Sequence, residues 1–105
     1  MALSRDFKVT VKARADRDPE FRQALAKEAL DCLLNGDIEV GQALLKNYVN
    51  ATVGFEGLSN AVHIPAKSLM RMLGPKGNPE AKSLFPILTF VRQREGLEFR
   101  TVAVA

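Results

Sequence analysis

The sequence predicts an all-α fold of five to six short helices followed by a short C-terminal β-strand. Apolar residues recur at intervals of three and four through most of the chain, as they do on one face of a helix. A capping residue followed by proline and an acid, the pattern of a helix start, occurs at Asp18-Pro19-Glu20 and at Asn78-Pro79-Glu80. At 105 residues the chain has the length of one small domain. We divide it into an N-terminal helical extension (1–36), a core (37–96) and a tail (97–105).

Residues 4–16 fit two alternatives. Apolar and polar residues alternate from Phe7 to Ala13, as in a strand, whereas Ser4 is a suitable cap for a helix. We favour the helix. Its basic face is typical of a solvated surface and, less often, of one that contacts DNA or an acidic partner. That face contains Arg5, Lys8 and Lys12.

The next two helices have clear boundaries. Asp18 and Pro19 begin the first, which Asn35-Gly36 ends, and Asp37 caps the second. The first presents an apolar stripe made of Phe21, Leu25, Ala29, Cys32 and Leu33. The second helix should end within residues 50–54. The side chains that we expect on its inward face are Ile38, Leu44, Leu45, Tyr48 and Val49.

The stretch from Phe55 to Pro79 is the most informative part of the chain. Its apolar residues recur at the spacing of a helix before and after His63-Ile64-Pro65. At those three residues the helical spacing is interrupted. Proline suits the first turn of a new helix. The pattern therefore predicts two short helices joined by a tight turn, the helix-turn-helix arrangement, whose second helix can lie in the DNA major groove. The side chains expected between the helices are Leu58, Val62, Leu69 and Met72.

The sequence of residues 78–104 predicts one more helix, followed by a strand. The helix should begin at Asn78-Pro79-Glu80, contain a kink at Pro86 and end at Gly96. Its inward residues are Leu84, Phe85, Leu88 and Val91. Residues 97–104 alternate as a strand that has no partner within the chain. Pairing of that strand with its copy in a second molecule, beside the last helix, predicts a homodimer.

Composition and charge exclude several classes of protein. A net charge of +3 permits binding to nucleic acid without requiring it. We expect a cytoplasmic protein, because the sequence has neither a membrane-length apolar run nor a signal-peptide pattern. Cys32 is the only cysteine, and we expect its thiol to be buried. His63, the only histidine, has no second ligand nearby. We therefore expect no metal, no cofactor and no catalysis.

The run SLMRMLGPKGNP, preceded by FEGLSNAVHIP and by a GD-capped helix, resembles the addiction-module antidote proteins of the HigA kind. These are a branch of the lambda-repressor-like helix-turn-helix proteins. The resemblance covers roughly residues 37–96, and the L-x-x-x-L-G-P-x-G-N-P run is its most specific part. Two positions depart from the pattern. His63 stands where many such turns have glycine, so its backbone is expected to be left-handed. Phe55 stands where a phosphate-binding glutamine is common.

The resemblance implies a small cytoplasmic antitoxin that binds a RelE-like RNase toxin and, as a homodimer, represses its own operon by binding operator DNA. DNA contacts are implied at Ala66, Lys67, Ser68, Met70 and Arg71 on the second helix of the pair. Lys76 and Asn78 precede a helix N-terminus, a favourable place for a phosphate. Two alternatives remain: a stand-alone transcriptional regulator, and a protein-interaction module with the same fold.

Overall fold

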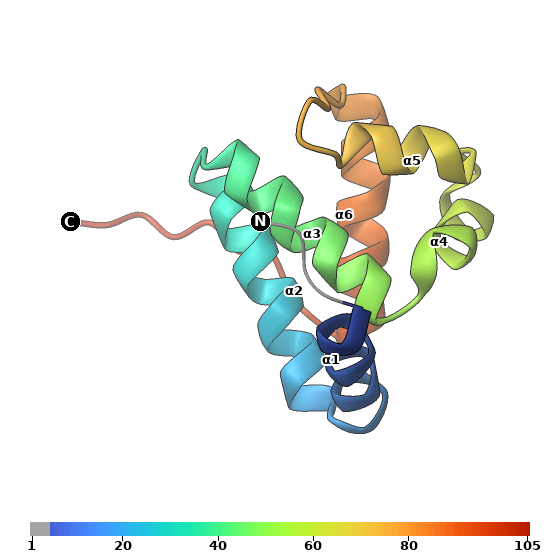
Figure 1. The fold of residues 1–105 in the computed structure, drawn as a ribbon. Helices are drawn as coiled ribbons and strands as arrows, with labels where there is room; N and C mark the ends of the chain where they lie inside the picture. The colour runs from blue at the N-terminus through green and yellow to red at the C-terminus, as the bar shows by residue number, and fades with distance from the viewer. Residues whose placement is uncertain (1–4) are drawn as a thin grey trace.

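The computed structural model describes residues 5–105, and within them the chain forms six α-helices joined by short loops (Figure 1). The helices are α1 (Arg5–Arg17), α2 (Pro19–Leu34), α3 (Ile38–Ala51), α4 (Gly54–Val62), α5 (Ala66–Met72) and α6 (Ala81–Glu95). The all-α prediction is confirmed for this part of the chain. The helical alternative for residues 4–16 is also confirmed, as α1. Its expected cap, Ser4, lies outside the described residues.

Helices α2 and α3 form an antiparallel pair at the centre of the fold (Figure 1). The Asp18 carboxylate caps α2 by accepting a hydrogen bond from the Phe21 backbone N–H at 3.1 Å. Gly36, with φ of +87°, provides the left-handed residue that ends the helix. Gly41 allows the two helices to approach closely, because a Cβ there would lie 2.6 Å from Leu33 Cγ. The glycine therefore determines where α3 first packs against α2.

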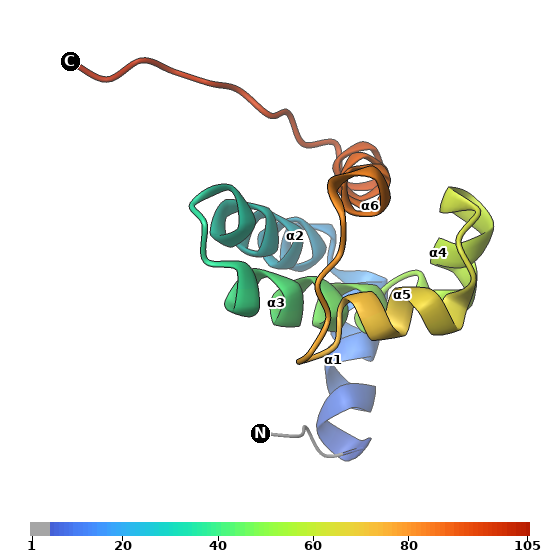
Figure 2. The same ribbon diagram turned by 90° about the horizontal axis from the view of Figure 1, so that it is seen from above.

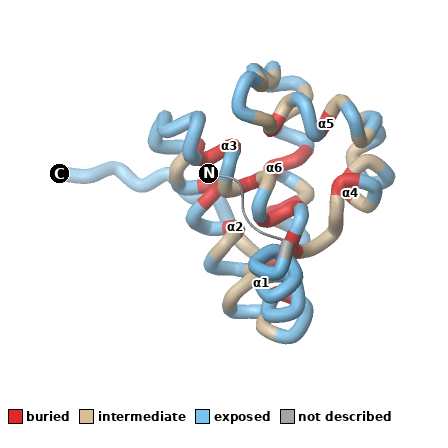
Figure 3. The backbone as a smooth tube through the Cα atoms, viewed as in Figure 1, coloured by how far each residue is buried: buried red, intermediate tan, exposed pale blue. Residues whose placement is uncertain are grey.

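The remaining helices pack around this pair. Helix α6 lies on the opposite side from α1, and α4 and α5 lie side by side at one end (Figure 2). Buried residues gather where α2, α3 and α6 meet and continue into α4 and α5 (Figure 3). The largest fully buried side chains are Tyr48, Leu45, Leu58, Leu69, Leu73, Ile87, Val49 and Val91. One core therefore holds all the helices from α2 to α6 together.

Two residues predicted to face inward do not. Ile38 is 47% exposed because it lies in the first turn of α3, ahead of the Gly41 contact. Phe85 is 56% exposed, because the buried stripe of α6 follows Ile87, Leu88 and Val91, and at 100° per residue Phe85 lies about a third of a turn from the centre of that stripe. Val62, Met72 and Cys32 are only partly buried.

The beginning of α6 also differs from the prediction. The helix starts at Ala81, and Glu80 is its N-cap residue without a side-chain capping bond. Asn78 therefore precedes the helix by three residues and does not cap it. Pro65 is likewise the N-cap of α5 and lies just before its first turn. Pro86 lies inside α6, where it has no N–H to donate to the Lys82 carbonyl.

The predicted C-terminal strand is not seen in this structure of a single chain. Leu97 still packs against the core, whereas residues 98–105 extend away from the helices without regular structure (Figures 1 and 2). Phe99, Val102 and Val104 are 45%, 70% and 92% exposed, so the tail also buries little apolar surface. The physical reason is that β-propensity alone forms no ladder, and no neighbouring strand exists among residues 5–105 to supply one. Leu88 and Val91, expected on the inward side of the last helix, are buried in the chain's own core.

Candidate nucleic-acid interface

The turn between α4 and α5 is tight and left-handed. His63 adopts φ 59° and ψ 39°, and its backbone N–H donates to the Ser59 carbonyl at 2.8 Å. This is the left-handed backbone expected at His63 from the sequence. Pro65, with φ −55°, is the N-cap residue of α5. Its carbonyl accepts a hydrogen bond from the Leu69 backbone N–H at 3.0 Å. Residues 63–65 therefore set α5 at an angle to α4 (Figure 1).

Helix α5 has one anchored face and one exposed face. Leu69 is completely buried, and Leu73, one turn later, is 1% exposed. Lys67, Met70 and Arg71 lie on the other side and are all exposed. The spacing of these residues explains the division, because positions three and four apart share a helical face. Two residues therefore hold the helix in the core while three remain accessible to a ligand.

Two other predicted site residues on α5 are less accessible. Ser68 is half-buried, and Ala66 is half-buried with its methyl group packed against the core. The exposed face of α5 therefore contains fewer residues than the sequence predicted. The five predicted residues of α5 fall into an exposed group of three and a half-buried pair.

The loop after α5 turns back tightly on the end of that helix. The Gly77 N–H donates to the Gly74 carbonyl at 2.9 Å, and the Gly74 N–H donates to the Arg71 carbonyl at 3.2 Å. A Cβ on Gly77 would lie 2.0 Å from the Met72 carbonyl oxygen, so no other residue fits without movement of the backbone. The glycines of the GPKG run therefore hold the exposed Lys76 next to the C-terminal end of α5.

Asn78 is exposed but does not act as the expected helix cap. Glu80 occupies the N-cap position of α6, so an acidic side chain lies where a bound phosphate was expected. The exposed Lys82 lies two residues further on, in the first turn of the helix. This end of α6 thus has charges of both signs, which makes it a poorer anion site than an uncharged helix N-terminus.

Among residues 5–105, the basic side chains around α5 form no ion pair with an acidic side chain. Within residues 5–105, the ion pairs involve cations on α1, α2, the end of α6 and the tail. None involves Lys67, Arg71, Lys76 or Lys82. Exposed cations without intramolecular partners are available to bind phosphates or base edges.

Phe55 is 7% exposed and belongs to the hydrophobic core. It is the residue that the resemblance drawn from the sequence compares with a phosphate-binding glutamine. Its aromatic ring has no hydrogen-bond donor for a phosphate and faces the interior. The start of α4 therefore lacks that contact.

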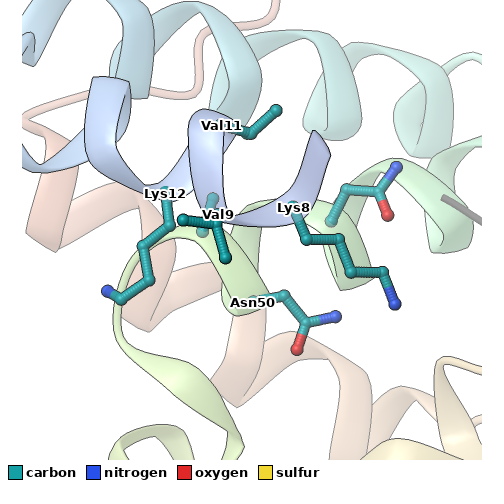
Figure 4. Close-up of a pocket in the computed structure, with 7 residues that line it drawn as sticks. Lys8, Val9, Val11, Lys12 and Asn50 are labelled. Carbon is teal, nitrogen blue, oxygen red and sulfur yellow. The ribbon is translucent and has the colours of Figure 1, made fainter. Parts of the chain in front are cut away.

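Two adjoining hollows lie between α1 and α3. One, of ≈ 260 Å³, is lined by Lys8, Val9, Val11 and Lys12 with Asn50 opposite (Figure 4). The other, of ≈ 490 Å³, shares Lys8 and Asn50 with it and reaches the loop at 73–75. Gln42 lines the second hollow, and its amide nitrogen has no partner among the described residues. The charged side chains that line the two hollows are Lys8, Lys12, Lys46 and Glu39, and Lys12 forms an ion pair with Asp16 at 3.5 Å.

A buried polar cluster connects α2, α3 and α6, and the sequence did not predict it. The Tyr48 hydroxyl donates to Glu95 Oε2, and Arg22 Nε lies 3.7 Å from Oε1 of the same carboxylate. The Gln23 amide donates to the Glu95 carbonyl at 2.7 Å. Burial, and then the bond to Glu95, raise the pKa of Tyr48. The only signal in the sequence is that Glu95 lies four residues after Val91 on the buried stripe of α6.

Cys32 is half-buried on α2. Burial, followed by the nearby Asp37, raises the pKa of its thiol. A raised pKa keeps the thiol protonated at neutral pH, and the thiolate is the reactive form. The raised pKa therefore makes the thiol of Cys32 less nucleophilic than that of a free cysteine.

No cluster of three or more metal-binding side chains occurs among residues 5–105. No helix in the same range is long and apolar enough to cross a membrane. Comparisons of the chain with protein-family models, with curated proteins and with solved structures found no match.

Proposed function

We propose that this protein is a sequence-specific DNA-binding regulator of the lambda-repressor-like helix-turn-helix type, with α4 and α5 as the paired helices and α5 as the recognition helix. The observation that carries the proposal is the division of α5 into a face anchored by Leu69 and an opposite face that presents Lys67 and Arg71, neither of which pairs with an acidic side chain in the part of the chain that the structure describes. A helix fixed in this way can enter the major groove without rearrangement of the core.

Each exposed residue has a contact that its chemistry suits. Lys67 and Arg71 are four residues apart and donate to guanine edges or to phosphates. Met70, 47% exposed between them, provides an apolar contact for a thymine methyl group. Ala66 and Ser68 are proposed to line the start of the helix close to the DNA. Lys76 and Asn78 are proposed as phosphate contacts next to it, with Lys76 the stronger because Glu80 lies near Asn78.

We further propose that the protein is a cytoplasmic, non-enzymatic antitoxin that represses its own operon as a homodimer. The support is the resemblance of residues 37–96 to the HigA-type antidotes. The partner would be a RelE-like RNase toxin. The N-terminal extension is longer than a minimal DNA-binding unit requires, and its helix α1 leaves Val9 61% exposed in the lining of the hollow beside α3. We therefore assign part of the toxin surface to α1.

The same hollows support an alternative function, a protein-interaction module without useful affinity for DNA. Binding to the DNA immediately upstream of the gene distinguishes the two, because DNA binding through lysine and arginine weakens steeply as salt rises. An adjacent gene for a small RNase-like protein distinguishes an antitoxin from a stand-alone regulator.

The assignment of the toxin surface has its own test. Deletion of residues 1–16, with expression of the neighbouring toxin and with protein levels checked, should reduce rescue of arrested cells. Full rescue by the shortened protein would remove α1 from the toxin surface.

A further inference from the structure

The larger of the two hollows between α1 and α3 has a buried amide group in its lining. Gln42, on α3, is 5% exposed and lines this hollow. Its side-chain nitrogen is enclosed and has no hydrogen-bond partner among residues 5–105. An enclosed amide nitrogen that donates no hydrogen bond destabilises a folded protein, and leucine would fill a similar space without that penalty. The amide therefore points to an acceptor that enters the hollow.

Two lysines in the same lining are available to a ligand. Lys8 comes from α1 and Lys46 from α3. Neither forms an ion pair in the part of the chain that the structure describes, although Lys46 is half-buried. Glu39 also lines the hollow, so the two lysines and one glutamate give the described lining a net charge of +1. This charge matches a ligand with a single negative charge better than a doubly charged phosphate ester.

The smaller hollow adjoins the larger one and has aliphatic side chains in its walls. These are Val9, Val11 and Ala51. Lys8 and Asn50 belong to both linings, so they lie where one hollow passes into the other (Figure 4). The larger hollow, of ≈ 490 Å³, has the size of a site for a small organic molecule. The pair of hollows therefore suits a ligand with a charged head and an apolar tail.

We propose that the two hollows form a binding site for a small monocarboxylate with an apolar tail. The carboxylate lies between Lys8 and Lys46, and a turn of the Gln42 amide about its terminal bond lets the enclosed nitrogen donate a hydrogen bond to it. Hydrogen bonds from charged donors to a carboxylate are stronger than those between neutral groups. The tail passes Asn50 and contacts Val9 in the smaller hollow. A few convergent polar groups thus fix the head of the ligand, as in other small-molecule sites.

The larger hollow also reaches the end of α5. Its lining includes Leu73, which is the C-cap residue of α5, and Gly74 and Pro75, which follow it. A carboxylate bound there lowers the positive potential beside Lys76 and should therefore weaken DNA binding, by about fivefold or more. This consequence rests on the proposed function, whereas binding of the carboxylate does not. Because the coupling is reciprocal, DNA should weaken carboxylate binding by the same factor.

Titration of the full chain with hexanoate, followed by nuclear magnetic resonance, tests the site. The side-chain amide signals of Gln42 and Asn50 should shift and saturate. Hexan-1-ol, which has the tail without the charge, and inorganic phosphate, which has charge without a tail, should each bind at least about tenfold more weakly. The same titration in the presence and absence of upstream DNA measures the coupling to α5.

Two variants and a control separate ligand binding from folding. Gln42→Leu and Lys46→Gln should each weaken hexanoate binding by at least about tenfold, as loss of a hydrogen bond to a charged group does. Gln42→Leu should be no less stable to urea than the unmodified protein, because leucine has a similar shape and needs no acceptor. Lys27→Gln is the matched control, because Lys27 is exposed on α2 and lines neither hollow, and it should retain the affinity.

Absence of a saturable shift at up to about 10 mM hexanoate, or equal binding of hexan-1-ol or phosphate, would overturn the proposal. Unchanged hexanoate affinity in Gln42→Leu and Lys46→Gln would also overturn it. A Gln42→Leu variant that loses stability together with binding would assign the amide to the fold instead of the ligand. Hexanoate binding without an effect on DNA affinity would refute the coupling alone, and failure of the unmodified protein to bind DNA would refute the proposed function alone.

Discussion

Replacement of Tyr48 by phenylalanine should destabilise the protein through the loss of a single hydroxyl group. Tyr48 is fully buried on α3, and its hydroxyl donates to the Glu95 carboxylate, itself only 6% exposed, on α6. Phenylalanine keeps the ring and therefore the packing. The remaining partners of the carboxylate are Arg22 at 3.7 Å and Arg94 at 3.8 Å, both longer than a hydrogen bond.

The size of the effect follows from the burial of the cluster. A hydrogen bond to a charged group contributes about 1.5–3 kcal/mol net, and the buried carboxylate would lose its one short side-chain donor. We therefore expect Tyr48→Phe to lower the free energy of unfolding by about 1.5–3 kcal/mol. The urea dependence of that free energy should be unchanged, because the surface exposed on unfolding stays nearly the same.

Urea denaturation followed by circular dichroism measures this change. Lys27→Gln is the matched control, because it breaks a pair of 2.6 Å to Asp31 that is exposed to solvent and should therefore change stability much less. Glu95→Gln, combined with Tyr48→Phe in a double-mutant cycle, should show a coupling between the two side chains of about 0.5–3 kcal/mol. A Tyr48→Phe variant no less stable than the Lys27→Gln control would refute the reasoning.

Two further predictions concern the core and its dependence on pH. Leu69→Ala should lower the free energy of unfolding by about 2–5 kcal/mol, because Leu69 is fully buried, and a nearly neutral change in a denaturation experiment would contradict the packing of α5. Because burial raises the pKa of Tyr48 in the folded state, its contribution to stability should be intact below the unfolded-state pKa of about 10 and be lost as the pH rises further. Ultraviolet titration of this single tyrosine checks the shift, and a folded-state pKa at the ordinary value would be inconsistent with it.

The sequence predicted the helices well because their boundary signals are local. Asp18 caps α2 as expected, Gly36 ends it, and His63 adopts the left-handed backbone that the turn requires. The division of α5 into a buried and an exposed face also followed from spacing alone. Capping, turn geometry and helical spacing each depend on a few neighbouring residues, so one sequence contains enough information to predict them.

The errors arose where distant residues decide the outcome. Phe85 was placed in the core by its spacing from Leu88, yet the direction from which α2 and α4 pack against α6 leaves it exposed. The Tyr48–Glu95 bond joins residues 47 positions apart, and no local pattern marks it. The tail has the composition of a strand, but strand formation depends on a partner, which residues 5–105 do not supply.

The proposed recognition role of α5 is tested most directly by the affinity of the Lys67→Ala/Arg71→Ala variant for duplex DNA from the region upstream of the gene, measured by fluorescence anisotropy. We predict that binding weakens by roughly 2–5 kcal/mol, as expected for the loss of two base or phosphate contacts. The charge-matched control is Lys27→Ala/Arg100→Ala, which removes two exposed cations from α2 and the tail and should retain most of the affinity. Unchanged affinity of the Lys67→Ala/Arg71→Ala variant, or an equal loss in both double variants, would contradict the assignment of α5 as the recognition helix.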